Sequence, residues 1–103
     1  MALNFLDIYG PSLWHTLHTF SANYKPENKI FFIQFVESFK RLIPCPKCRN
    51  SFSAHLKSIP LEKYLDNRKS VLVWSYLVHN EVNEKLGKKS PPFKDVLRFY
   101  INE

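Results

Sequence analysis

Apolar residues recur at three- and four-residue steps along almost the whole chain, which is the spacing of one face of an α-helix. No stretch alternates cleanly between apolar and polar residues over the length of a strand, and prolines and polar clusters separate the apolar runs at helix-sized intervals. The pattern therefore predicts an all-α fold: a compact four-helix bundle with a short fifth helix, in a single domain over residues 1–103.

Proline and glycine set the expected ends of these helices. The first helix is expected to begin at Gly10-Pro11, with Pro11 in the first turn, where its missing N–H costs nothing. It is expected to end at Lys25-Pro26, because a residue before proline avoids helical dihedrals. Gly87 is expected to cap the fourth helix at its C-terminus. The later helices are predicted over residues 27–42, from the C-x-x-C pair through residue 56, and over residues 70–86 and 93–100.

Composition narrows the possible functions. The chain has only two glycines, so it can contain neither a G-x-G-x-x-G dinucleotide fingerprint nor a Walker loop. Its net charge of +6 fits nucleic acid, an anionic membrane surface, a phosphate-bearing cofactor or simple solubility. No apolar run is long enough to span a bilayer, and the N-terminal residues lack the features of a secretory signal.

The only two cysteines, Cys45 and Cys48, form one C-x-x-C, which has several interpretations. A structural zinc site needs about four ligands, and no pair of the four histidines has compact finger spacing after these cysteines. A thioredoxin-like site needs a preceding strand, which the helical pattern argues against. Two inert buried thiols are the simplest alternative, but Lys47 and Arg49 beside a helix start weigh against it.

A redox role uses these same features. The positive end of a helix and nearby cations favour thiolate over thiol, so we expect both cysteines to have lowered pKa values. Two intervening residues on a helical turn bring the two sulfurs within disulfide reach. The sequence offers no second dithiol to accept electrons, so an enzyme of this kind implies a bound cofactor.

Three segments, in this order and spacing, resemble the Erv/ALR family of FAD-linked sulfhydryl oxidases. Residues 14–18 have the form W-x-x-L-H, residues 44–48 the form P-C-x-x-C, and residues 79–88 the form H-N-x-V-N-x-x-L-G-K. The resemblance covers essentially the whole chain. It implies FAD bound within a four-helix bundle without a glycine loop. It also implies oxidation of protein dithiols to disulfides, with electrons passing through flavin to molecular oxygen to give hydrogen peroxide.

The resemblance also implies roles for individual residues. Cys48 would lie against the flavin, and Cys45 would be the outer cysteine, attacked by a substrate thiolate that releases Cys48 as the better leaving group. Tyr100 stands near a family tryptophan that closes over the cofactor, and Lys85 and Lys88 could neutralise the diphosphate. The remaining positions assigned to cofactor binding are Gly10, Trp14, His18, Tyr24, His79, Asn80, Val82, Asn83 and Leu86. No metal site is expected.

Departures from the family pattern shape the expected partners. Gly10 is followed by Pro11 where the family often has arginine, so one phosphate contact is absent. No shuttle cysteine pair is present, so the chain is expected to meet a separate thiol-bearing protein directly. In this it resembles the minimal oxidases of large cytoplasmic DNA viruses. No targeting signal is visible, and the expected location is host cytoplasm or virion for a viral protein and otherwise the mitochondrial intermembrane space.

Some residues indicate structure or function independently of the resemblance. Asn80 and Asn83 are poor helix formers in the middle of a helix, which is a modest independent hint of function. Trp74 is expected in the core. The phenylalanines at 31, 32 and 35 exceed what one core face needs, which fits either a dimer interface or a crowded monomeric core, and the family resemblance implies a homodimer. The competing function is a small basic module that binds zinc or nucleic acid, but the basic residues form no dense stripe, so nucleic acid is not the expected partner.

Overall fold

The computed structural model describes residues 5–101, and the side chains from residue 10 onward. It confirms the all-α prediction, because residues 5–101 form five α-helices and two short 3-10 helices and contain no strand. The elements in chain order are α1 (Phe5–Ala22), η1 (Pro26–Asn28), α2 (Lys29–Leu42), α3 (Pro46–Ser58), η2 (Leu61–Tyr64), α4 (Arg68–Lys85) and α5 (Phe93–Tyr100).

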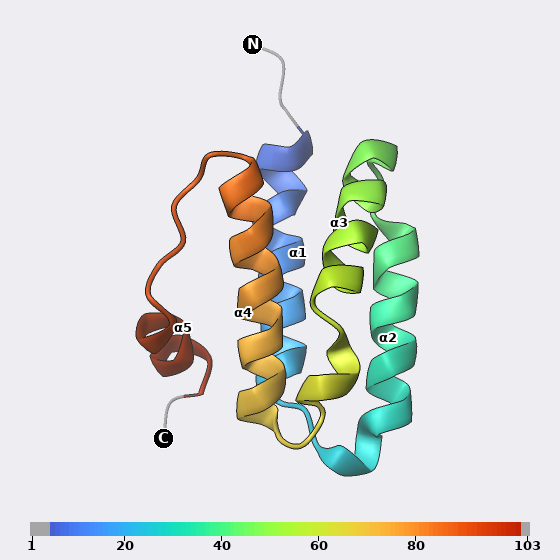
Figure 1. Cartoon of the computed structure of the whole chain (residues 1–103), viewed down its shortest axis with the longest axis vertical. Helices are drawn as coiled ribbons and strands as arrows, with labels where there is room; N and C mark the ends of the chain where they lie inside the picture. Colours follow the sequence, from blue (N-terminus) through green and yellow to red (C-terminus); the bar gives the residue numbers. More distant parts are fainter. Residues whose placement is uncertain (1–4, 102–103) are drawn as a thin grey trace.

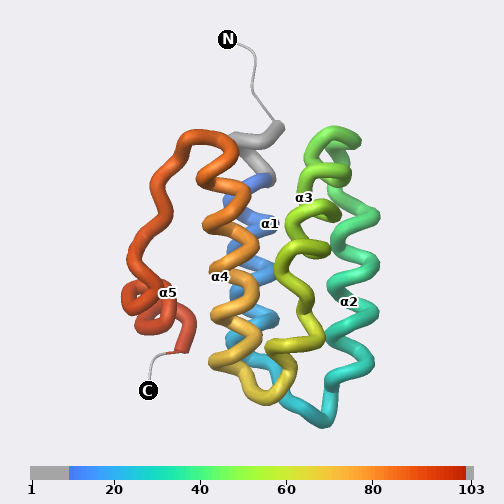
Figure 2. Tube along the Cα trace, in the orientation of Figure 1, coloured from blue at the N-terminus to red at the C-terminus, as the bar shows by residue number. Residues whose placement is uncertain are grey.

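Four of the helices form the bundle, and α5 lies outside it (Figure 1). α1 and α4 run side by side, α3 packs against α4, and α2 packs against α3. α5 lies beside the outer side of α4, as the trace in Figure 2 shows, and it also contacts α1. The first turn of α3 and the last turns of α4 lie at the same end of the bundle, at the top of Figure 1.

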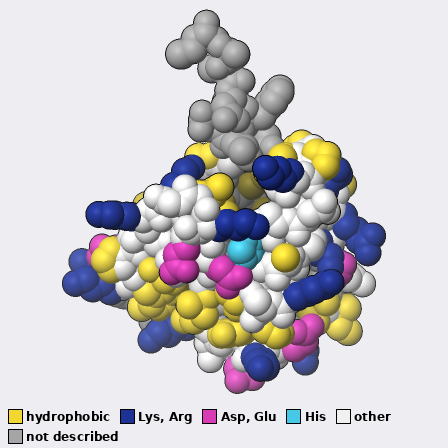
Figure 3. Space-filling model, turned by 45° about the horizontal axis from the view of Figure 1, so that its top comes forward, with side chains coloured by type: hydrophobic (Ala, Val, Ile, Leu, Met, Phe, Trp, Pro, Cys, Tyr) yellow, Lys and Arg dark blue, Asp and Glu magenta, His cyan; other side chains and the backbone are white. Residues whose placement is uncertain are grey.

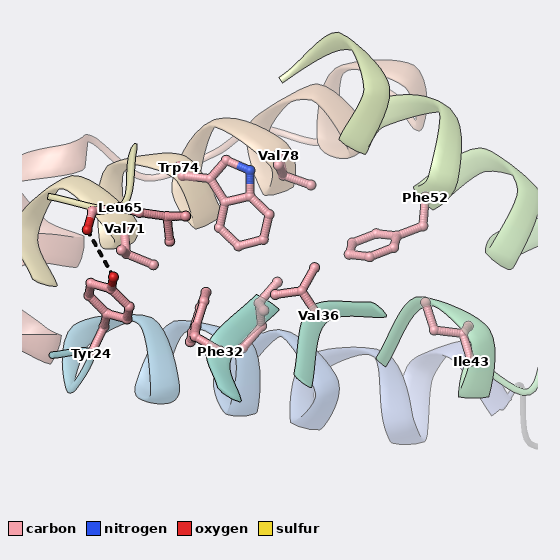
Figure 4. Close-up of a cluster of buried hydrophobic side chains, with 10 residues drawn as sticks. Tyr24, Phe32, Val36, Ile43, Phe52, Leu65, Val71, Trp74 and Val78 are labelled. Atoms are coloured by element: carbon pink, nitrogen blue, oxygen red, sulfur yellow. Dashed lines mark hydrogen bonds between the residues drawn. The ribbon is translucent and has the colours of Figure 1, made fainter. Parts of the chain in front are cut away.

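The core is built around Trp74, which α4 places in the middle of the bundle with no exposed surface. Its ring meets Phe32 of α2 edge-on, with the ring centroids 6.3 Å apart, and its Nε1 donates a hydrogen bond to the carbonyl of Ile59 at 3.0 Å. Figure 4 shows Phe32 and Val36 pointing from α2 toward this ring. The predicted core role of Trp74 is confirmed.

Both ends of α4 are determined by capping residues. Asn67 caps the N-terminus, where its side chain accepts a hydrogen bond from the Ser70 N–H at 2.9 Å. At the other end Gly87 adopts a φ of 71°, the left-handed conformation that glycine tolerates, and the Lys88 N–H then reaches back to the carbonyl of Asn83. The predicted glycine cap is therefore confirmed.

One helix start was predicted wrongly. α1 begins at Phe5 and not at Gly10, so Pro11 lies inside the helix and not in its first turn. A proline removes one helical hydrogen bond at a cost of about 3 kcal/mol, and this does not oblige the helix to begin there. α1 also ends at Ala22, three residues before the expected Lys25, and the remaining predicted bounds lie within two residues of those observed.

Candidate active site

The first cysteine caps helix α3. Cys45 has an extended backbone, with φ −91° and ψ 115°, and Pro46 follows it as the first helical residue. The Sγ atom of Cys45 accepts a hydrogen bond from the backbone N–H of Cys48 at 3.2 Å. A sulfur therefore occupies the position where a side-chain oxygen usually satisfies the free N–H groups of a helix start.

The second cysteine lies one helical turn further on and packs against the hydrophobic core. Both thiols are free, and both side chains are partly buried. On the same helix, Phe52 follows Cys48 by four residues and therefore lies on the same face. The pair thus joins a sulfur at the helix end to a sulfur that faces the core.

The two thiols have opposite electrostatic environments. The thiol and the backbone N–H of Cys48 both donate to Cys45 and lower its pKa, and the nearby Arg49 adds to this effect. Burial raises the pKa of Cys48, and the neighbouring Cys45 raises it further. The expectation of a lowered pKa at both cysteines is therefore wrong for Cys48, because its contact with the core outweighs its nearness to the helix start.

A stack of aromatic rings lies next to this helix. The indole of Trp14 on α1 lies face to face with the imidazole of His79 on α4, with ring centroids 3.9 Å apart and planes 6° apart. His18, one turn after Trp14, stacks more loosely on the same indole at 5.9 Å. Phe52 meets Trp14 edge-on at 5.8 Å, so the stack is connected to the helix that carries the cysteines.

The two histidines of this stack are uncharged at neutral pH. Burial, together with smaller effects of the nearby His79 and His15, lowers the pKa of His18 to about 3. Burial also lowers the pKa of His79 to about 4, with a smaller effect from Lys88. The Nε2 atom of His18 lies 3.0 Å from the Nδ1 atom of His79, and the Nδ1 atom of His18 lies 2.8 Å from the hydroxyl of Ser75.

Helix α5 brings Tyr100 to the stack. The hydroxyl of Tyr100 lies 2.8 Å from the Nδ1 atom of His15, and its ring centroid lies 5.4 Å from that of His18. The structure therefore gathers Trp14, His18, His79 and Tyr100, residues from three helices, into one cluster.

The other predicted cofactor residues lie around or away from this cluster. Tyr24 is buried in the core, where its hydroxyl donates to the Leu65 carbonyl at 2.8 Å (Figure 4), so its expected contact with a cofactor stays a prediction. The Asn83 side chain donates to the Ser90 hydroxyl at 3.0 Å, and the Asn80 side chain donates to Glu84 at 3.3 Å. The more peripheral positions are Gly10 and Val82, which are partly exposed, and Lys85, Leu86 and Lys88, which are exposed.

Sequence reasoning missed several polar residues. Ser75 is fully buried against His18, and the signal for it was its position four residues before His79 on the same helix. His15, to which the motifs assign no role, lies at the edge of the cluster through its contact with the Tyr100 hydroxyl. His55 and Glu81 join α3 to α4, with their Nδ1 and Oε1 atoms 2.5 Å apart.

Among residues 10–101, whose side chains are described, no group of three or more His, Cys, Asp or Glu could hold a metal ion. None of the helices described here is long and apolar enough to cross a membrane. Two surface hollows, of about 360 and 590 Å³, are lined by residues other than the cysteines and the ring stack. Lys and Arg side chains are scattered over the end of the bundle shown in Figure 3 and form no single patch there.

Comparison with known proteins places these features in a family. The profile of the Erv1/Alr family matches residues 11–100. The chain is 30% identical over 92 residues to a probable FAD-linked sulfhydryl oxidase of Acanthamoeba polyphaga mimivirus, covering 87% of this chain and 64% of that protein. It is 29% identical over 96 residues to an FAD-linked sulfhydryl oxidase of African swine fever virus, covering 89% of this chain and 79% of that protein.

A cellular relative shows the same similarity over a shorter part of its length. The chain is 30% identical over 83 residues to the mitochondrial FAD-linked sulfhydryl oxidase erv1 of Schizosaccharomyces pombe, and it spans 46% of that protein. The family profile covers both cysteines, the ring stack and α5. The chain therefore belongs to the Erv1/Alr family.

Proposed function

We propose that this chain is an FAD-dependent thiol oxidase that forms disulfides in protein substrates through Cys45 and Cys48. The observation that carries the proposal is the cysteine pair at the start of α3, where Cys45 caps the helix and Cys48 packs against the core. The viral and cellular relatives, which are FAD-linked sulfhydryl oxidases by name, support the same activity and the same cofactor.

The residues around the cysteines fit a flavin nucleotide. Trp14 and His79 offer flat aromatic surfaces, and Lys88, close enough to influence the His79 pKa, offers a cation for a diphosphate. Two rings only 3.9 Å apart leave no room for a third between them, so a planar cofactor would lie against the outside of the stack. Bound FAD would supply a two-electron acceptor that can be reoxidised by molecular oxygen, with hydrogen peroxide as the product.

The thiol exchange begins with the disulfide form of the pair. A substrate thiolate attacks the sulfur of Cys45, a new sulfur–sulfur bond forms there, and the Cys45–Cys48 bond breaks to release Cys48 as a thiolate. A second substrate thiolate then attacks the substrate sulfur of this mixed disulfide and releases Cys45. The substrate leaves with one disulfide, and the pair keeps the two electrons.

Two features of the pair act in opposite directions in this exchange. Access favours attack at Cys45, because Cys48 packs against the core while Cys45 sits at the helix end. The lower pKa of Cys45 makes it the better leaving group, which on its own would favour attack at Cys48. We infer that access decides, because a protein thiol reaches a sulfur at the helix end more readily than one that packs against the core.

The proposal extends to partners. The thiol-bearing substrate would be a separate protein that meets Cys45 directly. We propose a homodimer that forms through an apolar strip over α1 and α2. Phe20 and Phe31 are exposed there, and the ring centroids of Phe20 and Phe35 lie 4.9 Å apart. Phe31 and Phe35 are one turn apart on the same face of α2.

Absorption spectra and turnover of three proteins test the function. The purified wild-type protein should show the visible absorption of oxidised flavin and consume oxygen with a dithiol substrate. A Cys48→Ser variant should keep the flavin and lose turnover, and the matched Cys45→Ser variant should also lose turnover. A wild-type protein that binds no flavin, or a Cys48→Ser variant that still oxidises thiols, would refute the proposal.

A further inference from the structure

Ser75 lies in the middle of a buried line of polar groups. Its hydroxyl has no exposed surface, donates a hydrogen bond to the Leu72 carbonyl at 2.9 Å, and lies 2.8 Å from Nδ1 of His18. The other ring nitrogen of His18 lies 3.0 Å from Nδ1 of His79. The line therefore runs from a backbone carbonyl of α4 through Ser75 and His18 to His79.

Counting protons gives this line a direction. A serine hydroxyl has one proton, and the Leu72 carbonyl can only accept, so the hydroxyl must accept from His18. Nδ1 of His18 therefore carries the proton of the neutral ring, and its Nε2 is an acceptor. Nδ1 of His79 must then donate to that acceptor, which leaves Nε2 of His79 without a proton.

If the hydrogen bonds along this line ran in the opposite direction, one hydrogen bond fewer would form. If Ser75 donated to His18, its hydroxyl would give up the bond to the Leu72 carbonyl, although the two oxygens lie 2.9 Å apart. The Ser75 hydroxyl is fully buried, where a lost hydrogen bond is most costly. The low pKa values of both histidines agree with neutral rings, in which the choice of tautomer is meaningful.

The free nitrogen of His79 is the end of this line that can meet a ligand. His79 is partly exposed, and no residue of the described chain hydrogen-bonds its Nε2 atom. Lys88 lies near enough to lower the pKa of His79, and cations in this neighbourhood suit a ligand with phosphates. FAD carries hydrogen-bond donors on its adenine, its isoalloxazine and its hydroxyl groups.

We propose that Ser75 is a positioning residue that fixes the tautomers of His18 and His79, so that His79 presents Nε2 as a hydrogen-bond acceptor to a donor of the bound flavin nucleotide. The identity of the ligand rests on the proposed function, and the tautomers do not. Ser75 itself makes no contact with the ligand and acts only through the two histidines.

Removing the hydroxyl reverses the line. In a Ser75→Ala variant the Nδ1 proton of His18 would have no partner, so the proton moves to Nε2 of His18, which then donates to Nδ1 of His79. His79 now carries its proton on Nε2 and presents a donor where an acceptor stood. A ligand donor would meet another donor, and we expect FAD to bind at least about tenfold more weakly.

The chain supplies a matched control. Ser21 is also fully buried within a helix, and its hydroxyl also donates to a backbone carbonyl one turn earlier, that of Leu17, at 2.7 Å. Its side chain has no hydrogen bond to a histidine. A Ser21→Ala variant therefore removes the same group from the same kind of environment and should leave both tautomers unchanged.

Nitrogen-15 NMR of the histidine rings tests the tautomers directly, because two-bond proton–nitrogen correlations show which ring nitrogen carries the proton. In the wild-type protein His18 and His79 should both be protonated on Nδ1. In Ser75→Ala both should be protonated on Nε2, and in Ser21→Ala both should match the wild type. An Nε2 proton on either ring of the wild-type protein would overturn the proposal even if the variant failed to fold.

Titration with FAD tests the contact between His79 and the ligand separately from the tautomers. Reversed tautomers together with FAD affinity equal to that of Ser21→Ala would overturn the role of His79 as an acceptor for the ligand. A wild-type protein with the expected tautomers that binds no FAD would refute the proposed function and leave the assignment of Ser75 to the tautomers standing.

Discussion

Mild acid should destabilise this protein well above the pH at which its carboxylates titrate. The perturbation is a fall from about pH 8 to about pH 5, and the groups that respond are His18 and His79. Burial holds the pKa of His18 at about 3 and that of His79 at about 4, whereas both take up protons near pH 6.5 in the unfolded chain. The unfolded state therefore binds more protons in this window, so stability falls as pH falls.

The magnitude follows from the unfolded pKa. At about pH 5 each histidine is protonated in the unfolded chain and neutral in the folded one, which lowers the free energy of unfolding by about 2 kcal/mol per histidine. Together the pair should lower it by about 4 kcal/mol, a large part of the stability of a small domain. Because both folded pKa values lie below this pH, the result depends little on their precise values.

Urea denaturation at several pH values measures this effect. Glu37 and Glu81 also have lowered pKa values, but their contributions are lost only below their unfolded value of 4.5, outside the window. A His79→Asn variant should lose about half of the pH dependence. An unfolding free energy that stays constant from about pH 8 to about pH 5 would refute the claim that both rings are buried and neutral.

Three further outcomes are expected. Truncating the fully buried side chain in Trp74→Ala should lower the free energy of unfolding by about 3–5 kcal/mol, and Trp74→Phe by less, in urea denaturation. In the reduced protein, iodoacetamide should modify Cys45 at lower pH than Cys48, as mass spectrometry of the alkylated peptides would show, and the reverse order would contradict the pKa assignment. Phe31→Lys should convert a dimer to monomers in analytical ultracentrifugation, whereas Leu42→Lys, at another exposed apolar side chain, should not.

The local signals in the sequence predicted most of the fold. Helical periodicity gave the number and order of the helices, and Gly87 gave the end of α4, because both effects act within a few residues of the chain. Pro11 gave the wrong start for α1, because a proline is compatible with both a first turn and a helix interior.

The site was less accessible to sequence reasoning. The motifs named Trp14, His18 and His79, but not that the indole and the second imidazole lie in face-to-face contact. Ser75 and His18 are 57 positions apart, and only the packing of α1 against α4 brings them together. The opposite pKa shifts of the cysteines were missed for a related reason: which face of α3 meets the core depends on its neighbours.

The different environments of the two cysteines suit the two different steps of the proposed reaction. A helix start offers free N–H groups at its end and a covered face one turn later, so two residues at C-x-x-C spacing experience these two environments separately. Cys45 has the first and Cys48 the second. Thiol exchange with another protein needs an accessible sulfur, and transfer of electrons to a cofactor among the helices needs a sulfur facing inward. One turn of α3 would supply both sulfurs.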